Sequence, residues 1–240
     1  MQHLRDTDGT STHRRAIRFH LAKCRSGHTP LHDQLRLEAG AAYQDLKAKQ
    51  RAAEDVEDDL AEAAAEADTT EIVLENALRD VDADLERLDR DRPGTNARRA
   101  VFPAGFGAVI EPEGERQLDV LPALHVRLEP YKSEPSLASS MAKLTAAEGA
   151  FKQALAAEDA AGAALEVAFA KELAARAAVR AQLTSAHARL RDLYKSRPAQ
   201  AEAFFLKLGR KEGKPRPTGK VATGEPKGGG ISTGGTPPAE

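Results

Sequence analysis

Residues 39–88 read AGAAYQDLKAKQRAAEDVEDDLAEAAAEADTTEIVLENALRDVDADLERL, and apolar side chains recur in this stretch at every seventh position. The column consists of Ala39, Leu46, Ala53, Leu60, Ala67, Leu74, Val81 and Leu88. A second column, three places further on, holds Leu35, Ala42, Val56, Ala63 and Ala77 and is interrupted by Lys49, Thr70 and Asp84. Two such columns predict a long helix, residues 34–91, that buries one narrow stripe against another helix, as in a coiled coil.

A second helical stretch, residues 136–197, provides the partner. Its two columns hold Leu137, Leu144, Phe151, Leu165, Val179 and Leu193, and Met141, Leu155, Phe169, Leu183 and Leu190. Several polar or small residues fall in the same columns and predict looser packing: Glu148, Glu158, Gly162, Glu172 and Arg176. Each helix would have roughly 60 residues and span ~90 Å at ~1.5 Å per residue. The matched lengths favour pairing within one chain, as a long antiparallel coiled-coil helical hairpin.

The charge distribution favours the same pairing. Residues 38–92 carry about eighteen acidic and about seven basic side chains, whereas residues 136–197 carry about six acidic and about nine basic ones. The first helix would therefore repel a copy of itself and attract the second helix. Exposed ion pairs contribute only ~0.2 to 1 kcal/mol each, so they set orientation more than stability.

Composition limits the class of protein. The 240 residues are only 4% aromatic and contain no tryptophan, which argues against a thick globular core and for thin helical packing. Cys24 is the single cysteine, so no intramolecular disulfide can form. No apolar run is long enough for a membrane span or a signal-peptide core. We therefore expect a cytoplasmic, predominantly all-α protein with no membrane partner.

A Pro- and Gly-rich segment, residues 92–135, separates the two helices. Residues 100–102 and 108–110 predict two short strands, and residues 117–128 predict a short helix. We expect these to form a small β/helix insert at the tip of the hairpin, where Phe102 and Phe106 are candidate interaction residues.

The order of long helix, short β-rich insert and long helix resembles that of a prefoldin-like subunit. The resemblance covers roughly residues 34–197, with VFPAGFGAVIEP (101–112) as the insert. It implies strands that assemble several hairpins and helix ends that hold unfolded proteins. No functional residue is carried over, because no specific motif supports the match.

The two ends of the chain differ in composition. Residues 1–33 form a basic, His-containing arm with room for a short helix. Residues 198–209 predict a short amphipathic helix, whose Phe204, Phe205 and Leu208 would either dock on the open end of the hairpin or form a contact patch for another molecule. Residues 210–240 are rich in Gly, Pro and Lys and predict a disordered tail, so both termini are expected to be flexible.

One group of residues has the composition of a metal site. His20, Cys24, His28 and His32 recur every four residues and would share one helix face, a pattern suited to Zn²⁺. Gly27 and Pro30 interrupt that helix, so a polar arm without metal is the favoured interpretation. No phosphate-binding loop or nucleophile motif is present, and the paired acids lie on predicted solvated helix faces. We expect no catalytic residues and no cofactor.

These features predict a non-enzymatic structural or scaffold subunit, an elongated spacer that self-associates or docks on protein partners through its ends. Two alternatives remain open. One is a prefoldin-like chaperone, as the resemblance implies. The other is a nucleic-acid-associated protein that uses its basic N- and C-terminal arms, because phosphate contacts depend on counterion release rather than on a fold.

Overall fold

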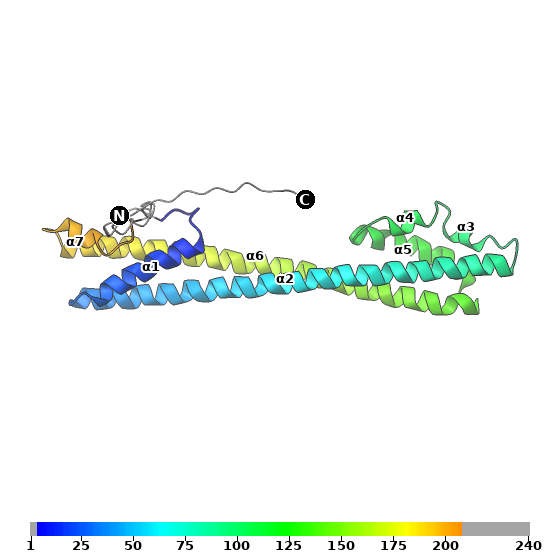
Figure 1. The fold of residues 1–240 in the computed structure, drawn as a ribbon, viewed down its shortest axis with the longest axis horizontal. Helices are drawn as coiled ribbons and strands as arrows, with labels where there is room; N and C mark the ends of the chain where they lie inside the picture. Colours follow the sequence, from blue (N-terminus) through cyan, green and yellow to red (C-terminus); the bar gives the residue numbers. More distant parts are fainter. Residues whose placement is uncertain (1–3, 208–240) are drawn as a thin grey trace, which may run out of the picture. The chain divides into compact units, whose positions relative to one another are not determined.

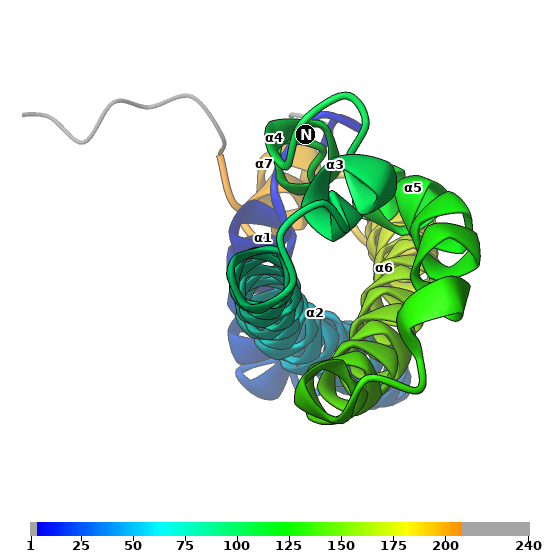
Figure 2. The ribbon, with the colours of Figure 1, turned by 90° about the vertical axis from the view of Figure 1, so that its right-hand side faces the viewer.

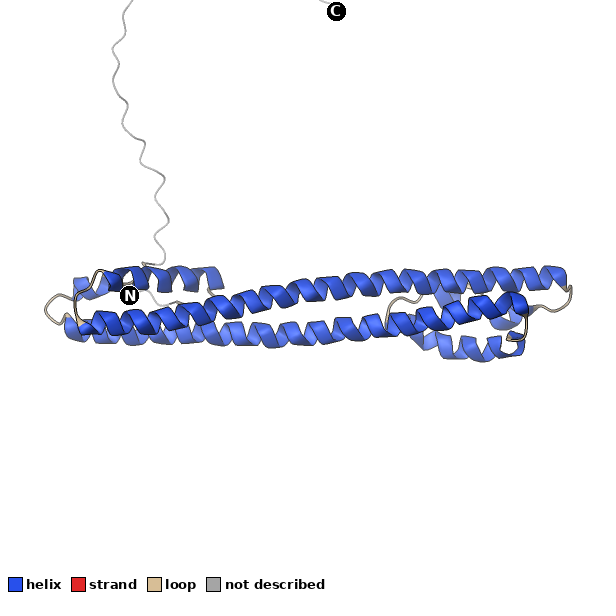
Figure 3. Cartoon of the chain, turned by 90° about the horizontal axis from the view of Figure 1, so that it is seen from below, coloured by secondary structure: helices blue, strands red, loops and turns tan. Residues whose placement is uncertain are grey.

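Two long helices dominate the computed structural model, which describes residues 4–207. Helix α2 (Pro30–Asp91) and helix α6 (Pro135–Leu193) lie side by side and run in opposite directions (Figure 1). The described part of the chain contains helices and loops and no strand (Figure 3). The prediction of a predominantly all-α protein is therefore confirmed.

The stripe that α2 buries against α6, here called the seam, follows the predicted seven-residue column. Every member of that column is buried except Leu60, which is half-buried. On α6, Leu137, Leu144, Phe151 and Val179 are buried as the pattern predicts. The neighbouring α6 positions in the seam are small, with Ser140, Ala147, Ala154 and Ala175 all buried. Small side chains let two helices approach closely, which leaves the larger neighbours on the flanks.

Proline residues and left-handed backbone fix the helix ends. Pro30 and Pro135 occupy the first turns of α2 and α6, where the missing N–H group has no intrahelical partner to lose. Helix α2 ends at Asp91, and Gly94 (φ +101°) and Asn96 (φ +50°) then turn the chain back. Both residue types tolerate positive φ better than most. The long helices therefore start and stop where the sequence demands it.

The predicted β insert at the tip is wrong. Residues 100–102 and 108–110 lie in or beside two short helices, α3 (Ala97–Val101) and α4 (Gly107–Ile110). The third element, α5 (Glu115–Leu128), agrees with the predicted helix at 117–128 and continues into a 3₁₀ turn, Glu129–Tyr131. A two-stranded hairpin is at best marginally stable by itself, whereas the short helices α3 and α4 here bury Val101, Phe102 and Val109 in the core that α2 and α5 also line.

The tip elements enclose the thickest core of the described residues. Leu121, Leu124 and Leu128 of α5 pack with side chains from α2 and α6, including Leu85 and Phe151. These side chains fill the centre around which Figure 2 shows α2, α3, α5 and α6. Polar contacts fasten α3 to α2: both carboxylate oxygens of Asp82 accept bonds from Arg98 at 2.6 and 2.9 Å, and Asp89 accepts the backbone N–H of Ala97 at 2.6 Å.

The opposite end of the paired helices, here called the base, is formed by residues 4–32 and 172–207. Helix α1 (Thr10–Arg25) packs on α2 and α6, and the short α7 (Pro198–Glu202) packs on α6. The turn between α1 and α2 contains Gly27. Helix α2 starts at Pro30, four residues before the predicted start at residue 34. Leu208 and the predicted disordered tail at 210–240 lie outside the described residues.

Candidate functional site

The base contains a buried cluster of histidine and aromatic rings contributed by four segments. His20 of α1 stacks on Phe205, with ring centroids 4.9 Å apart, and His32 of α2 stacks on Phe204 at 5.1 Å. Tyr194, just beyond α6, lies 6.0 Å from both His32 and Phe204. We call these five residues the base cluster. It joins residues nearly two hundred positions apart in the sequence.

The hydrogen bonds of the base cluster are consistent with neutral histidines. The Nδ1–H of His20 donates to the carbonyl of Phe204 at 3.3 Å, which leaves Nε2 to accept the Cys24 thiol at 3.5 Å. His32 contacts hydroxyl groups through both ring nitrogens: Thr29 Oγ1 at 2.6 Å and Tyr194 Oη at 3.1 Å. Every one of these partners is uncharged, so none stabilises an imidazolium.

Burial lowers the pKa of three histidines at the base. For His20, whose exposed fraction is 0%, desolvation lowers the pKa and outweighs the bond to the Phe204 carbonyl. Desolvation likewise lowers the pKa of His32 and of His13, and the guanidinium of Arg180, 3.2 Å from His13, acts in the same direction. The three side chains are thus held neutral in the interior.

The proposed metal quartet is divided between different environments. His20 and His32 both belong to the base cluster, with Cys24 beside His20 and with Thr29 and Tyr194 beside His32, whereas His28 is exposed. Among residues 4–207, no group of three or more His, Cys, Asp or Glu side chains has the arrangement of a metal site. Burial raises the pKa of the Cys24 thiol to about 11, so the thiolate form that metals bind is disfavoured.

Charged side chains fasten α1 to α6 beside the cluster. Glu172 of α6 is buried and accepts bonds from the Thr10 hydroxyl and, at 2.8 Å, from Arg176. Burial raises the pKa of Glu172, but these two hydrogen bonds lower it by more, so the net shift is downward. Further along the seam, Arg189 reaches Glu38 of α2 at 2.8 Å. Glu172, a polar residue in the predicted seam, thus ties the start of α1 to α6.

The candidate interaction residues at both ends are largely enclosed. Phe204 and Phe205 pack inside the base cluster, and Phe102 is buried at the tip, where Phe106 is half-buried and meets it edge-on at 5.3 Å. Phe204 and Phe205 therefore dock on the open end of the long helices. The rings that Phe204 and Phe205 contact are those of His20, His32 and Tyr194, and the sequence pattern did not predict these contacts.

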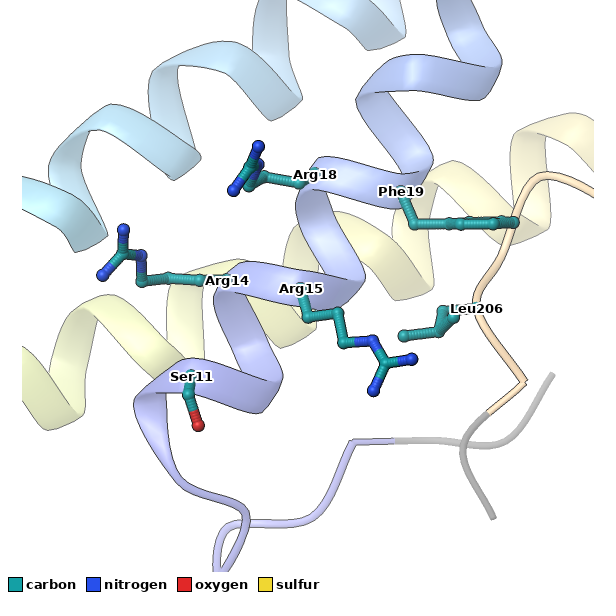
Figure 4. Close-up of a pocket in the computed structure, with 6 residues that line it drawn as sticks. All are labelled: Ser11, Arg14, Arg15, Arg18, Phe19 and Leu206. Atoms are coloured by element: carbon teal, nitrogen blue, oxygen red, sulfur yellow. The ribbon is translucent and has the colours of Figure 1, made fainter. Parts of the chain in front are cut away.

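The outer face of α1 is strongly basic. Ser11, Arg14, Arg15, Arg18, Phe19 and Leu206 line an open hollow of about 600 Å³ (Figure 4). Arg14 and Arg18 point toward α2, whereas Phe19 lies on the other side of the helix, next to Leu206 (Figure 4). Arg14 donates to Gln50 of α2 at 2.8 Å. An anionic surface would complement this face.

None of the helices within residues 4–207 is both long and apolar enough to cross a membrane. Comparison with protein-family models, with curated proteins and with solved structures gives no match. The function is therefore argued from the geometry alone.

Proposed function

We propose that the protein is a non-enzymatic scaffold subunit, in which α2 and α6 form an antiparallel coiled-coil hairpin that holds its base and its tip a fixed distance apart. It works through geometry: the long helices set the spacing, and surfaces on them or at the ends bind a second copy or another protein.

The observation that carries this proposal is the seam. The 62 residues of α2 pair with the 59 residues of α6, and a helix of this length spans roughly 90 Å at ~1.5 Å per residue. Helices this long bury too little surface to fold separately, so their pairing maintains the spacing. The base and the tip each add a small core that fastens one end.

The test is small-angle scattering coupled to light scattering on the full chain. We expect a maximum dimension of about 90 Å or more per particle. Leu46→Asp, at a fully buried seam position, should abolish the extended particle and lower the helical circular dichroism. Leu37→Asp is the matched control, because Leu37 is 69% exposed on the same helix. A particle much shorter than one long helix would refute the proposal.

Nucleic-acid binding is a second candidate, favoured by the exposed arginines of α1. It predicts binding of a DNA or RNA duplex that weakens steeply with salt and is lost in Arg15→Glu/Arg18→Glu. Absent or salt-independent binding would remove it.

A further inference from the structure

Along one stretch of α2 and α6, none of the helices within residues 4–207 packs on the face that holds α1 and the tip. Gln50 of α2 contacts Arg14 of α1, and Glu71 accepts the backbone N–H of Gly114 at 2.6 Å. Gln50 and Glu71 are three heptads apart, so they lie in one column of α2. On α6, Arg176 beside α1 and Glu148, bonded to His125 of α5, are four heptads apart. Both α1 and the tip therefore lie on the same face.

Between these contacts, residues 51–70 of α2 and 156–171 of α6 form what we call the uncovered stretch, which ends beside Glu172, bonded to Thr10 of α1. In Figure 1 the two helices run bare between α1 and the tip elements. No α6 residue between Ala154 and Glu172 is buried, and on α2 only Ala67 is buried between Ala53 and Leu74. The seam is at its thinnest here.

The uncovered stretch is acidic and partly apolar. Every charged side chain in residues 52–70 of α2 is a carboxylate. Glu57 lies in the same column as Gln50, and Asp68 lies in the column of Glu54, which Gln50 binds at 2.6 Å. On α6, Phe169 is 48% exposed and Leu173, just beyond the stretch, is 42% exposed; they lie two turns and one turn, respectively, from the Arg176 that borders α1. A basic helix would therefore complement this surface.

Helix α1 has the opposite charge and a suitable length. All its charged side chains are basic, and its exposed residues form what we call the outward stripe: Ser11, Arg15, Arg18, Ala22, Lys23 and Arg25. Arg18, Ala22 and Arg25 lie on the edge of this stripe that borders α2. Its 16 residues span ~24 Å, and the 20 residues at positions 51–70 span ~30 Å, at ~1.5 Å per residue. One further α1 fits the uncovered stretch in length and in charge.

We propose that two copies of this chain associate antiparallel, so that α1 of each copy lies on the uncovered stretch of the other. The inference rests on the proposed scaffold function and names its partner. The two contacts are equivalent under a two-fold axis, which closes the assembly at two copies. Each α1 is then enclosed between its own long helices and those of the second copy, and Phe169 and Leu173 are covered.

The test uses two charge-reversed variants of the full chain. Arg18→Glu/Arg25→Glu reverses two charges on the outward stripe of α1, and Glu57→Arg/Asp68→Arg reverses two of the eight carboxylates at residues 52–70 of the uncovered stretch. Each variant alone places like charges opposite one another at the changed positions of both contacts, so its dimer dissociation constant should rise at least about tenfold over that of the wild type. An equimolar mixture presents opposite charges at both contacts and should restore the dimer. Sedimentation equilibrium over a concentration and salt series measures all three.

The control is Arg116→Glu, which makes the same charge change at an exposed position of α5 and should leave the dissociation constant unchanged. Circular dichroism verifies that every variant remains folded. A wild type that is monomeric at all concentrations, or a mixture that stays monomeric, would overturn the dimer. Neither result would contradict the scaffold function, which the particle length in the scattering experiment tests separately.

Discussion

Acidification should unfold the base of this protein before its carboxylates are protonated. The pKa of His13, His20 and His32 is lowered in the folded chain, chiefly by burial. Below pH ~6.5 the unfolded chain takes up protons that the folded chain excludes. The stability contributed by neutral burial is therefore complete above pH ~6.5 and is lost as the pH falls toward the folded pKa values.

The size of the effect follows from proton linkage. Each such histidine lowers the free energy of unfolding by up to about 1.4 kcal/mol per pH unit in this window, so three lower it by up to about 4 kcal/mol. Whole domains are stable by only ~5 to 15 kcal/mol, so a single pH unit removes a large share. Carboxylates with ordinary pKa values near 4 remain ionised throughout.

The assay is urea denaturation followed by circular dichroism at 222 nm, at intervals from pH 7.5 to pH 5.5. His20→Phe keeps a ring against Phe205 and removes one buried titrating group, so the slope of stability against pH should fall by about one third. His28→Gln changes an exposed histidine and should keep the wild-type slope. Stability that is constant or increases as the pH falls would refute the reasoning.

Three further predictions concern single side chains. Phe151→Ala, in the tip core and 1% exposed, should lower the free energy of unfolding by about 3 to 5 kcal/mol, whereas Phe169→Ala, 48% exposed, should change it by less than about 1 kcal/mol in the same urea titration of the monomer. Gln117→Leu should raise stability by about 1 kcal/mol or more, because the fully buried Gln117 amide has no hydrogen-bond partner among the described residues; an unchanged or lower midpoint would indicate an ordered water there. The Cys24 thiol, 1% exposed and with its pKa raised to about 11, should react with a thiol reagent at pH 8 only when the base opens, so rapid reaction of the native protein would contradict the buried assignment.

The long helices were predictable because a seven-residue repeat has one simple solution, a buried stripe against a second helix. The tip was not predictable from local pattern, since Val101 and Val109 have β propensity but are buried by helical turns against α2 and α5. The α6 pattern misled in a similar way: Phe169 was assigned to the seam but is 48% exposed, whereas the small residues Ala154 and Ala175 are buried. Where the backbones of two helices approach closely, a large apolar side chain is not necessarily the one that is buried.

The base cluster shows a different limit of sequence reasoning. His20, Cys24 and His32 stood out by their spacing, which suggested a metal, and Phe204 and Phe205 stood out as apolar residues in a chain that has few. Neither feature of the sequence indicates that these histidines stack on these phenylalanines, because the stacked rings come from α1 and α2 on one side and from residues beyond α6 on the other.

Helix α1 has two roles, packing at the base and contacting a second copy, and the second depends on the first. The inward face of α1 is held by His13, His20 and Thr10, and its outward face carries the arginines that the proposed dimer needs. Protonation of the buried histidines weakens the inward contacts while the arginines keep their charge, so a loosened α1 loses the rigid placement that aligns it with a second copy. The dimer should then dissociate over the same pH range in which the base loses stability, and His20→Phe should move both transitions together. Sedimentation at each pH tests this, and a dimer that persists after the base has opened would separate the two roles.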